Sequence, residues 1–164
     1  TLCAYHDDKV MRSLALWSNV YVALAEYRLQ LLNEASFRGY PVVRHPVLHF
    51  PNDERFNCCN GSDRKKTKKD KDGWSSSYSD SFMLGDLLYV APVLKSGVRK
   101  KKVYLPEGGW IHLWTEEQVA GPHSIGKTVE VMAPLGEPPV FVRDVDTMHR
   151  FVEDLRHRHI IRRR

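Results

Sequence analysis

Cysteine is scarce in this sequence, and long hydrophobic runs are missing. The 164 residues include three cysteines, Cys3, Cys58 and Cys59, of which two are adjacent and none stands in a C-x-x-C spacing. This pattern supplies neither a disulfide framework nor a zinc site, so we expect reduced thiols and no bound metal. No apolar run approaches the roughly 20 residues that a membrane-spanning helix needs. The composition therefore predicts a soluble, globular chain without a membrane segment.

Familiar catalytic signatures are absent as well. The sequence contains no G-x-S-x-G, H-E-x-x-H, P-loop or G-x-G-x-x-G pattern. His45 and His49 lie four residues apart, and on a strand this spacing separates same-face side chains by about 13 Å, so we do not expect them to share a metal. The length suits one ordinary domain or two small ones, which excludes a complete multidomain enzyme. The first residue is Thr1 rather than Met, which favours a sequence that begins inside a longer or processed polypeptide.

Positive charge is present in excess but is concentrated locally. Twenty-five basic against 20 acidic residues give a formal charge of +5, and six of the eight residues from Arg64 to Lys71 are basic. Residues 57–80 lack aliphatic character and are predicted to form a basic, disordered insertion. The run could bind nucleic acid, but no aromatic-rich sheet or recognition helix accompanies it, so we expect no nucleic-acid partner. Asn60 opens a glycosylation sequon, which matters only in a secreted protein.

The N-terminal segment predicts one long amphipathic helix. Asp7 and Asp8 precede it as capping carboxylates, and Gly39 provides a left-handed stop. Residues 42–50 then predict a short strand buried on both faces, with a bulge or strand end near Pro46, which lacks the N–H of a ladder. The apolar stripe of the helix recurs at steps of three and four and comprises Val10, Leu14, Trp17, Tyr21, Leu24, Leu31 and Ala35.

From Phe82 onward, short extended runs separated by turn residues predict an antiparallel β-sandwich. The predicted strands are 87–93, 102–105, 110–114, 128–132 and 140–143. A C-terminal helix is predicted at about 147–159, with an apolar stripe of Val145, Met148, Val152 and Leu155. Trp110 and Trp114 share parity on one strand, so they form either a sugar-stacking platform or part of the sandwich core.

Several of these segments, in this order, resemble glycoside hydrolase family 31. Arg38–Asp53 resembles the family pattern P-V-x-R-P-L-x-x-x-x-P-x-D, and Ser81–Val93 resembles Q-F-x-L-G-x-x-L-L-V-A-P-V. The segments Val103–Pro106, Gly109–Thr115 and Ala133–Arg143 follow in family order. Within the family, W-x-H-L-W-T and G-x-P-P-V-F-x-R resemble the sulfoquinovosidase branch more than the maltase branch. The departures are the basic insertion and the extra His45 between Arg44 and Pro46.

The resemblance implies the C-terminal part of a retaining α-glycosidase built on a (β/α)8 barrel. In this family two carboxylates about 5 to 5.5 Å apart carry the reaction, and both lie upstream of the segments matched here. No aspartate of this chain matches either one, so we assign it no catalytic residue and expect the chain alone to be inactive. The implied substrate is an α-glucoside or a sulfoquinovoside, bound through the upstream barrel, and no cofactor is implied.

The implied fold is an α/β barrel remnant, the last helix and strand of a TIM barrel, followed by an antiparallel β-sandwich and a C-terminal helix, β-rich overall. We place the barrel remnant at residues 1–56, the insertion at 57–80, the β-sandwich at 81–144, and the C-terminal helix with its basic tail at 145–164. Barrel active sites lie at the carboxyl ends of the strands, which places His49, Phe50 and Asp53 at the rim of the substrate pocket. Arg44, earlier on the strand, is expected to pair with a buried carboxylate.

Two alternatives stay open at this point. The sandwich could be a non-catalytic carbohydrate-binding module that uses Trp110 and Trp114, or the parent could be an inactive relative of the hydrolases. If residues 1–56 belong to a barrel, the isolated chain exposes an unpaired strand edge and an apolar helix face. We therefore expect the isolated chain to be poorly soluble.

Overall fold

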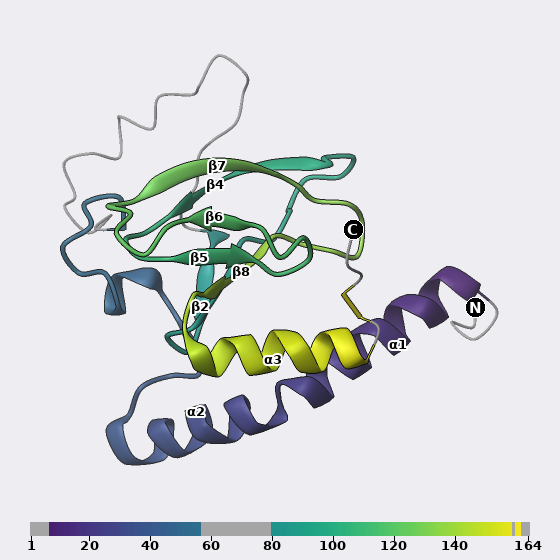
Figure 1. Ribbon diagram of the computed structural model, residues 1–164, viewed down its shortest axis with the longest axis horizontal. Coiled ribbons are helices and arrows are strands. Elements are labelled where there is room, and N and C mark those ends of the chain that lie inside the picture. The colour runs from purple at the N-terminus through teal and green to yellow at the C-terminus, as the bar shows by residue number, and fades with distance from the viewer. Residues whose placement is uncertain (1–6, 57–79, 159, 162–164) are drawn as a thin grey trace. The chain divides into compact units, whose positions relative to one another are not determined.

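The computed structural model describes residues 7–56, 80–158 and 160–161, and the chain divides into two compact units (Figure 1). One unit is helical and comprises Thr1–Val42 with Val145–Arg164. The other, Val43–Asp144, contains the β-strands. The predicted Asn60 sequon, the Arg64–Lys71 run and the three cysteines lie outside the described residues.

The helical unit contains α1 (Asp8–Ala23), α2 (Ala25–Arg38) and α3 (Asp146–His157). Both predicted ends of the first helical segment are confirmed. The Asp7 side chain accepts a hydrogen bond of 2.8 Å from the Lys9 amide, which satisfies one of the free N–H groups of the first turn. Gly39 adopts φ 73°, a left-handed conformation that suits glycine, and its amide donates to the Ala35 carbonyl.

The prediction of one uninterrupted helix is wrong, because Leu24 separates α1 from α2. Leu24 has φ −82° and ψ 2°, outside the α-helical range. Its amide still donates to the Val20 carbonyl and its own carbonyl accepts from the Arg28 amide. The interruption is therefore a local change of direction between two helices and not a loop.

The predicted apolar stripe of this segment is only partly buried. Val20, Tyr27 and Leu31 are buried, and of these Leu31 belongs to the predicted stripe, whereas its members Leu14 and Tyr21 are exposed. α1 contacts α3, whose Met148, Val152 and Leu155 are buried as predicted. The prediction thus holds for Leu31 on α2, whereas the α1 part of the stripe, which begins with Val10 and Leu14, is exposed.

The β-unit consists of two antiparallel sheets, as predicted. A six-stranded sheet has the order β1-β2-β3-β8-β5-β6, and β4 and β7 pair in a two-stranded sheet that forms a separate layer in Figure 1. The strands are β1 (Val43–Arg44), β2 (Phe82–Leu84), β3 (Leu88–Val90), β4 (Lys100–Leu105), β5 (Trp110–His112), β6 (Gln118–Ala120), β7 (Lys127–Met132) and β8 (Val140–Arg143). The sequence pattern missed β2 and β6, which have only three residues each and show no clear alternation.

Aromatic side chains fill the core between these sheets. Trp110, Tyr89 and Phe141 are fully buried, with Tyr89 5.9 Å from Trp110 and 6.4 Å from Phe141 between ring centroids. Tyr104 and Val103 of β4 close the same cluster from the two-stranded sheet. The sheets therefore share one hydrophobic core, the arrangement that buries the inward residues of both layers.

The segment after α2 forms a much shorter strand than its apolar sequence predicts. The strand comprises Val43 and Arg44, and β1 pairs antiparallel with β2 at one end of the six-stranded sheet. The side chain of Val43 is exposed, so the prediction of burial on both faces is wrong. The expected strand end near Pro46 is confirmed, because the chain turns there into a 3₁₀ helix, Pro46–Leu48.

Candidate functional site

The segment from His45 to Phe56 shapes the candidate site. His45 caps the 3₁₀ helix by accepting, at its Nδ1, a 3.2 Å hydrogen bond from the Val47 amide. Pro46 occupies the first helical position, where its missing N–H leaves no bond unmade. The Phe50 amide then donates to the Pro46 carbonyl at 2.9 Å. These local bonds reverse the chain and direct the Phe50 ring into the protein.

Phe50 is a core residue of this site. It is 3% exposed and lies 6.3 Å from Phe56 and 6.5 Å from Trp110 between ring centroids. The guanidinium of Arg143 lies 5.4 Å from the Phe50 ring and 5.8 Å from the Trp110 ring. Phe50 therefore anchors the segment to the β-unit, and this anchoring limits how much of its ring could meet a ligand.

Asp53 is held by hydrogen bonds at both carboxylate oxygens. Its Oδ2 accepts a 2.6 Å bond from the Tyr104 hydroxyl, and its Oδ1 accepts a 3.1 Å bond from the Arg55 amide. Its backbone is also fixed, since the Asp53 amide donates to the Phe50 carbonyl and the Phe56 amide donates to the Asp53 carbonyl. The carboxylate is therefore a well-placed acceptor with a defined orientation.

A cavity of about 250 Å³ opens beside this carboxylate. Acidic and amide side chains face it from one segment, and Tyr104 and Ile125 contribute from β4 and from the turn before β7. Its lining residues are Phe50, Pro51, Asn52, Asp53, Glu54, Tyr104, Glu107 and Ile125. Carboxylate and amide oxygens around an aromatic wall can accept hydrogen bonds from hydroxyl groups, which is the chemistry that a neutral sugar offers.

The three residues predicted for the pocket rim are only partly brought together. Phe50 and Asp53 line the cavity, whereas His49 belongs to a different contact. The Nε2 atom of His49 lies 3.3 Å from a terminal nitrogen of Arg44, whose side chain is buried. The His49 ring also meets Phe50 edge-on, with centroids 6.5 Å apart. His49 is thus placed to hold Arg44 and not to line the cavity.

Tyr104, Glu107 and Ile125 were not predicted as site residues. Tyr104 pairs with Thr128 in the β4–β7 sheet, and Ile125 lies just before β7. The available signal was that 102–105 and 128–132 were both predicted as strands. The missing information was that these two strands pair with each other and that Tyr104 contacts a residue 51 positions earlier in the chain.

Two ionisable groups of the β-unit are changed by burial. Burial lowers the pKa of Lys101 from its ordinary value of 10.5, and the charge of Asp80 partly offsets this. The Lys101 ammonium donates to the Pro92 carbonyl, which gives the half-buried charge a partner. Burial likewise lowers the pKa of His112 below 6.5, against an opposing effect of Glu117. Neither residue lines the cavity beside Asp53.

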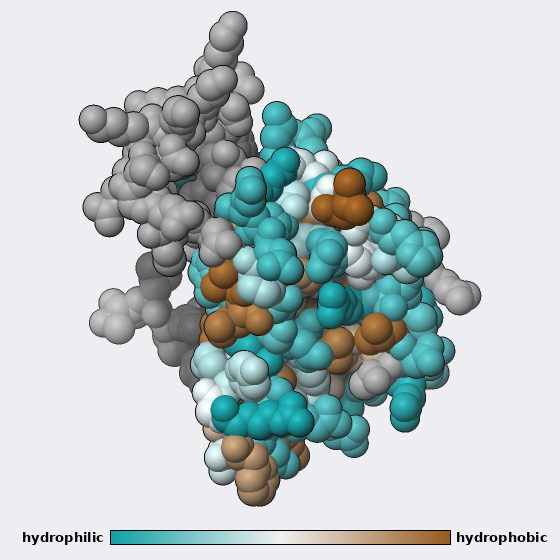
Figure 2. All heavy atoms as spheres, turned by 90° about the vertical axis from the view of Figure 1, so that its left-hand side faces the viewer, coloured by the Kyte–Doolittle hydropathy of each residue, from teal (hydrophilic) through white to brown (hydrophobic). Residues whose placement is uncertain are grey.

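The tryptophan pair does not form a stacking platform. Trp110 is fully buried, and its Nε1 donates to the Pro106 carbonyl at 3.0 Å. Trp114 lies beyond the end of β5, and its partly buried Nε1 donates to the Pro138 carbonyl at 2.7 Å. The core interpretation is therefore confirmed for Trp110. Where Figure 2 shows described residues, hydrophobic side chains form small separated groups on a mainly hydrophilic face.

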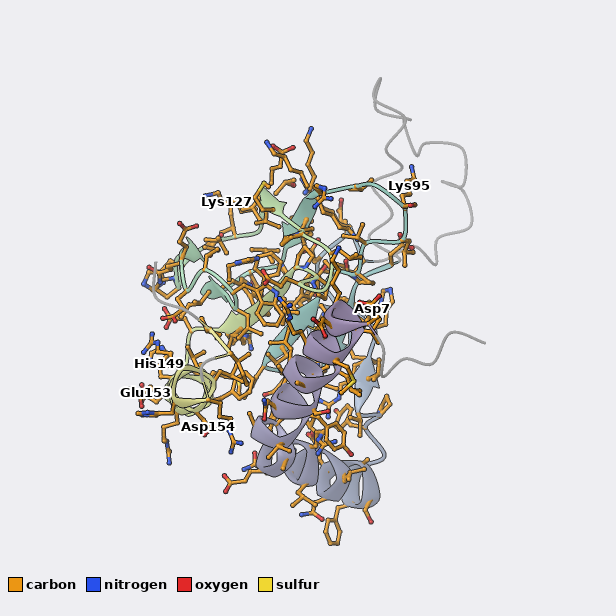
Figure 3. The ribbon with its side chains drawn as sticks, turned by 90° about the vertical axis from the view of Figure 1, so that its right-hand side faces the viewer. Asp7, Lys95, Lys127, His149, Glu153 and Asp154 are labelled. Atoms are coloured by element: carbon orange, nitrogen blue, oxygen red, sulfur yellow. The ribbon has the colours of Figure 1, made fainter. Side chains whose placement is uncertain are left out.

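The described part of the chain contains no cluster of three or more His, Cys, Asp or Glu side chains that could hold a metal ion. None of the described helices is long and apolar enough to cross a membrane. On α3, His149 and Glu153 project into solvent (Figure 3).

The helical unit contains a second, larger cavity of about 510 Å³ between α2 and α3. Tyr27, Met148 and Phe151 supply its apolar lining, and Glu26, Arg150 and Asp154 are among its polar residues. Asp154 is already paired, because its Oδ2 accepts a 2.8 Å bond from Arg158. This ion pair is part of the helix surface and places no free charge at the cavity.

Comparison with known proteins places this fold in a family. Residues 39–145 match the glycosyl hydrolase family 31 C-terminal domain. Among curated proteins, a sulfoquinovosidase of Agrobacterium fabrum is 34% identical over 92% of this chain and 19% of its own length, and one of Escherichia coli is 28% identical over 84% and 17%. A solved sulfoquinovosidase structure from E. rectale superimposes with a TM-score of 0.74 at 26% identity, over 97% of this chain and 20% of that protein.

The chain thus spans about a fifth or less of these relatives' length. The match to the C-terminal domain includes the whole β-unit and the cavity beside Asp53. The predicted resemblance is confirmed: the chain belongs to glycoside hydrolase family 31 and corresponds to the C-terminal domain of its α-glycosidases.

Proposed function

We propose that this chain is the C-terminal portion of a retaining α-glycoside hydrolase whose catalytic carboxylates precede it in a longer polypeptide. The observation that carries the proposal is the extent of the match: 92% of this chain aligns with the Agrobacterium fabrum sulfoquinovosidase but covers 19% of that enzyme. A hydrolase of this class needs two carboxylates about 5 to 5.5 Å apart. In our proposal this chain supports the domain that carries them.

The surface of α1–α2 supports the same proposal. Leu14, Tyr21, Leu29, Leu32 and Phe37 are all exposed, although helices of globular proteins normally bury such side chains. Val10, Leu14, Trp17 and Tyr21 recur at helical spacing, so they form one stripe along α1. We propose that the preceding barrel covers this stripe, with residues 1–56 supplying the last helix and strand of the (β/α)8 fold.

The position of β1 is compatible with this arrangement. β1 stands at one end of the six-stranded sheet of the described residues, with β2 as its neighbour. An edge strand offers backbone N–H and C=O groups for pairing with a further strand. In our proposal the other edge of β1 continues the barrel, and the β-unit, residues 81–144 in particular, supports the barrel from outside.

In this role the chain contributes to the substrate pocket only at its rim. The cavity beside Asp53 places hydroxyl-binding groups next to Phe50, and His49 stabilises the start of the same segment through Arg44. We propose that this rim contacts the sugar or its leaving group, while the reaction occurs at the upstream acids. The substrate is an α-glucoside or a sulfoquinovoside, and the sulfoquinovosidases among the relatives favour the latter.

The experiment is a comparison of two substrates with the longer polypeptide. We expect hydrolysis of the p-nitrophenyl α-glycoside of glucose or of sulfoquinovose, with the released sugar formed first as the α-anomer, which proton NMR detects. A polypeptide that hydrolyses neither substrate would show that the parent is an inactive relative. Initial release of the β-anomer would contradict a retaining mechanism.

A further inference from the structure

A single hydroxyl group connects two parts of the β-unit that are far apart in the sequence. The Tyr104 hydroxyl of β4 donates to the Oδ2 of Asp53 at 2.6 Å, across 51 residues of chain. Hydrogen bonds to a charged acceptor are shorter and stronger than neutral ones. Tyr104 is 6% exposed, and its hydrogen bond to Asp53 is partly buried.

Arg55 adds a second connection between the same two parts. Its guanidinium lies 4.2 Å from the centre of the Tyr104 ring, and its terminal nitrogen donates to the Thr128 hydroxyl of β7 at 3.4 Å. Phe56 also packs against Tyr104, with the two ring centroids 5.6 Å apart. Tyr104 therefore contacts Asp53, Arg55 and Phe56.

The turn before β7 is shaped to leave room for this hydroxyl. A Cβ atom at Gly126 would overlap the Tyr104 hydroxyl and would lie 3.0 Å from its Cζ atom. Gly126 also has φ 108°, a conformation that side chains rarely adopt. Glycine at this position therefore allows both the positive φ of the backbone and the close approach of the Tyr104 hydroxyl.

We propose that Tyr104 is a positioning residue: through the Asp53 carboxylate it holds the Phe50–Phe56 segment against the β4–β7 sheet and so fixes the rim of the substrate pocket. The effect of Tyr104 on the substrate pocket rests on the proposed function, since the rim matters only if a sugar binds there. The holding of the Phe50–Phe56 segment by Tyr104 is tested without any substrate.

The first test measures hydrogen exchange at the amides of Arg55 and Phe56 in the longer polypeptide. These amides are bonded to the side chain and the carbonyl of Asp53. Tyr104→Phe removes the hydroxyl and keeps the ring, and we expect about tenfold faster exchange at both amides. Tyr21→Phe, which removes a tyrosine hydroxyl from α1, is the matched control and should leave them unchanged. Unchanged exchange in Tyr104→Phe would overturn the inference.

The second test separates the loss of the hydroxyl from backbone strain. Gly126→Ala and Gly136→Ala both place a side chain at positive φ, 108° and 92°, but nothing lies within 4 Å of a Cβ atom at Gly136. We expect Gly126→Ala to speed exchange at Arg55 and Phe56 as Tyr104→Phe does, and Gly136→Ala to leave it unchanged. Equal effects of the two alanines would show that strain, and not Tyr104, controls the segment.

The third test concerns catalysis and uses steady-state kinetics on the substrate that the parent hydrolyses. A rim residue affects binding of the sugar and not the chemical step, so Tyr104→Phe should raise KM about tenfold and leave kcat within about twofold. A fall in kcat with unchanged KM, or no change in either, would overturn the positioning role. If the unaltered polypeptide has no activity, the proposed function fails, and the exchange measurements still decide whether Tyr104 fixes the segment.

Discussion

The two units of this chain bury their hydrophobic side chains to very different degrees. In the β-unit, Trp110 and Phe141 are fully enclosed between the sheets. In the helical unit, neighbouring leucines of α2 differ sharply: Leu31 is 3% exposed and Leu32 is 56% exposed. The β-unit thus completes its own core, whereas the helical unit leaves apolar side chains of α1 and α2 exposed. In the proposed arrangement the preceding domain would cover these side chains.

The largest expected effect tests the closed core. Trp110→Ala removes a fully buried ring and its hydrogen bond to Pro106, and we expect a loss of about 3 to 5 kcal/mol in the free energy of unfolding. Trp17→Ala, at a partly exposed position of α1, should cost about 1 kcal/mol or less. Guanidinium unfolding monitored by circular dichroism measures both. Similar losses would mean that the two units do not differ as the burial indicates.

The next prediction compares the two adjacent leucines of α2. Leu31→Ala should cost about 2 to 5 kcal/mol, because it leaves a cavity in the packed face of the helices. Leu32→Ala should change the stability of this chain by about 0.5 kcal/mol or less. In the longer polypeptide we expect Leu32→Ala to become costly, since the proposed barrel would bury it. A cost that stays negligible there would argue against the covered face.

A smaller effect is expected at the start of α1. Asp7→Ala removes the side chain that accepts from the Lys9 amide, and loss of such a cap costs about 1 kcal/mol. Asp7→Asn keeps a capping oxygen and should restore most of the loss. The melting temperature of the helical unit, followed at 222 nm, tests this pair. Equal melting temperatures for the alanine and asparagine variants would show that the cap contributes nothing.

The smallest effect concerns pH and the β-unit. Burial lowers the pKa of His112 below 6.5, so the folded state favours the neutral ring. Its stabilising contribution is therefore complete above pH 6.5 and is lost as the pH falls below 6.5 toward the lowered pKa. His112→Gln should flatten the fall in stability between pH 7 and pH 5, and His123→Gln, at an exposed position, should not. A parallel fall in both variants would exclude His112 as the cause.

Local features of this fold were predictable, because short-range chemistry determines them. Asp7 and Gly39 mark the helix ends by hydrogen bonds to residues two and four positions away. The strand end near Pro46 follows from the missing N–H of proline. The β7 strand shows the alternation that one wet face imposes.

Features that depend on distant residues could not be predicted. The stripe of Val10, Leu14 and Trp17 indicates a face that some partner buries, but periodicity does not identify the partner, and α3 packs elsewhere. The position of Asp53 after the predicted barrel strand suggested a pocket rim, but the sequence could not show its bond to Tyr104, which links residues 51 positions apart. The contact of His49 with the buried Arg44 depends on the 3₁₀ turn, which the sequence pattern did not predict.

The most direct test of the central claim is an activity assay of the purified 164-residue chain. Because we place both catalytic carboxylates in the preceding part of the polypeptide, we expect no hydrolysis of p-nitrophenyl α-glucoside or α-sulfoquinovoside above the buffer rate. The longer polypeptide, assayed at the same molar concentration, should hydrolyse one of them. Measurable turnover by the 164-residue chain, abolished by a carboxylate substitution within it, would contradict the account.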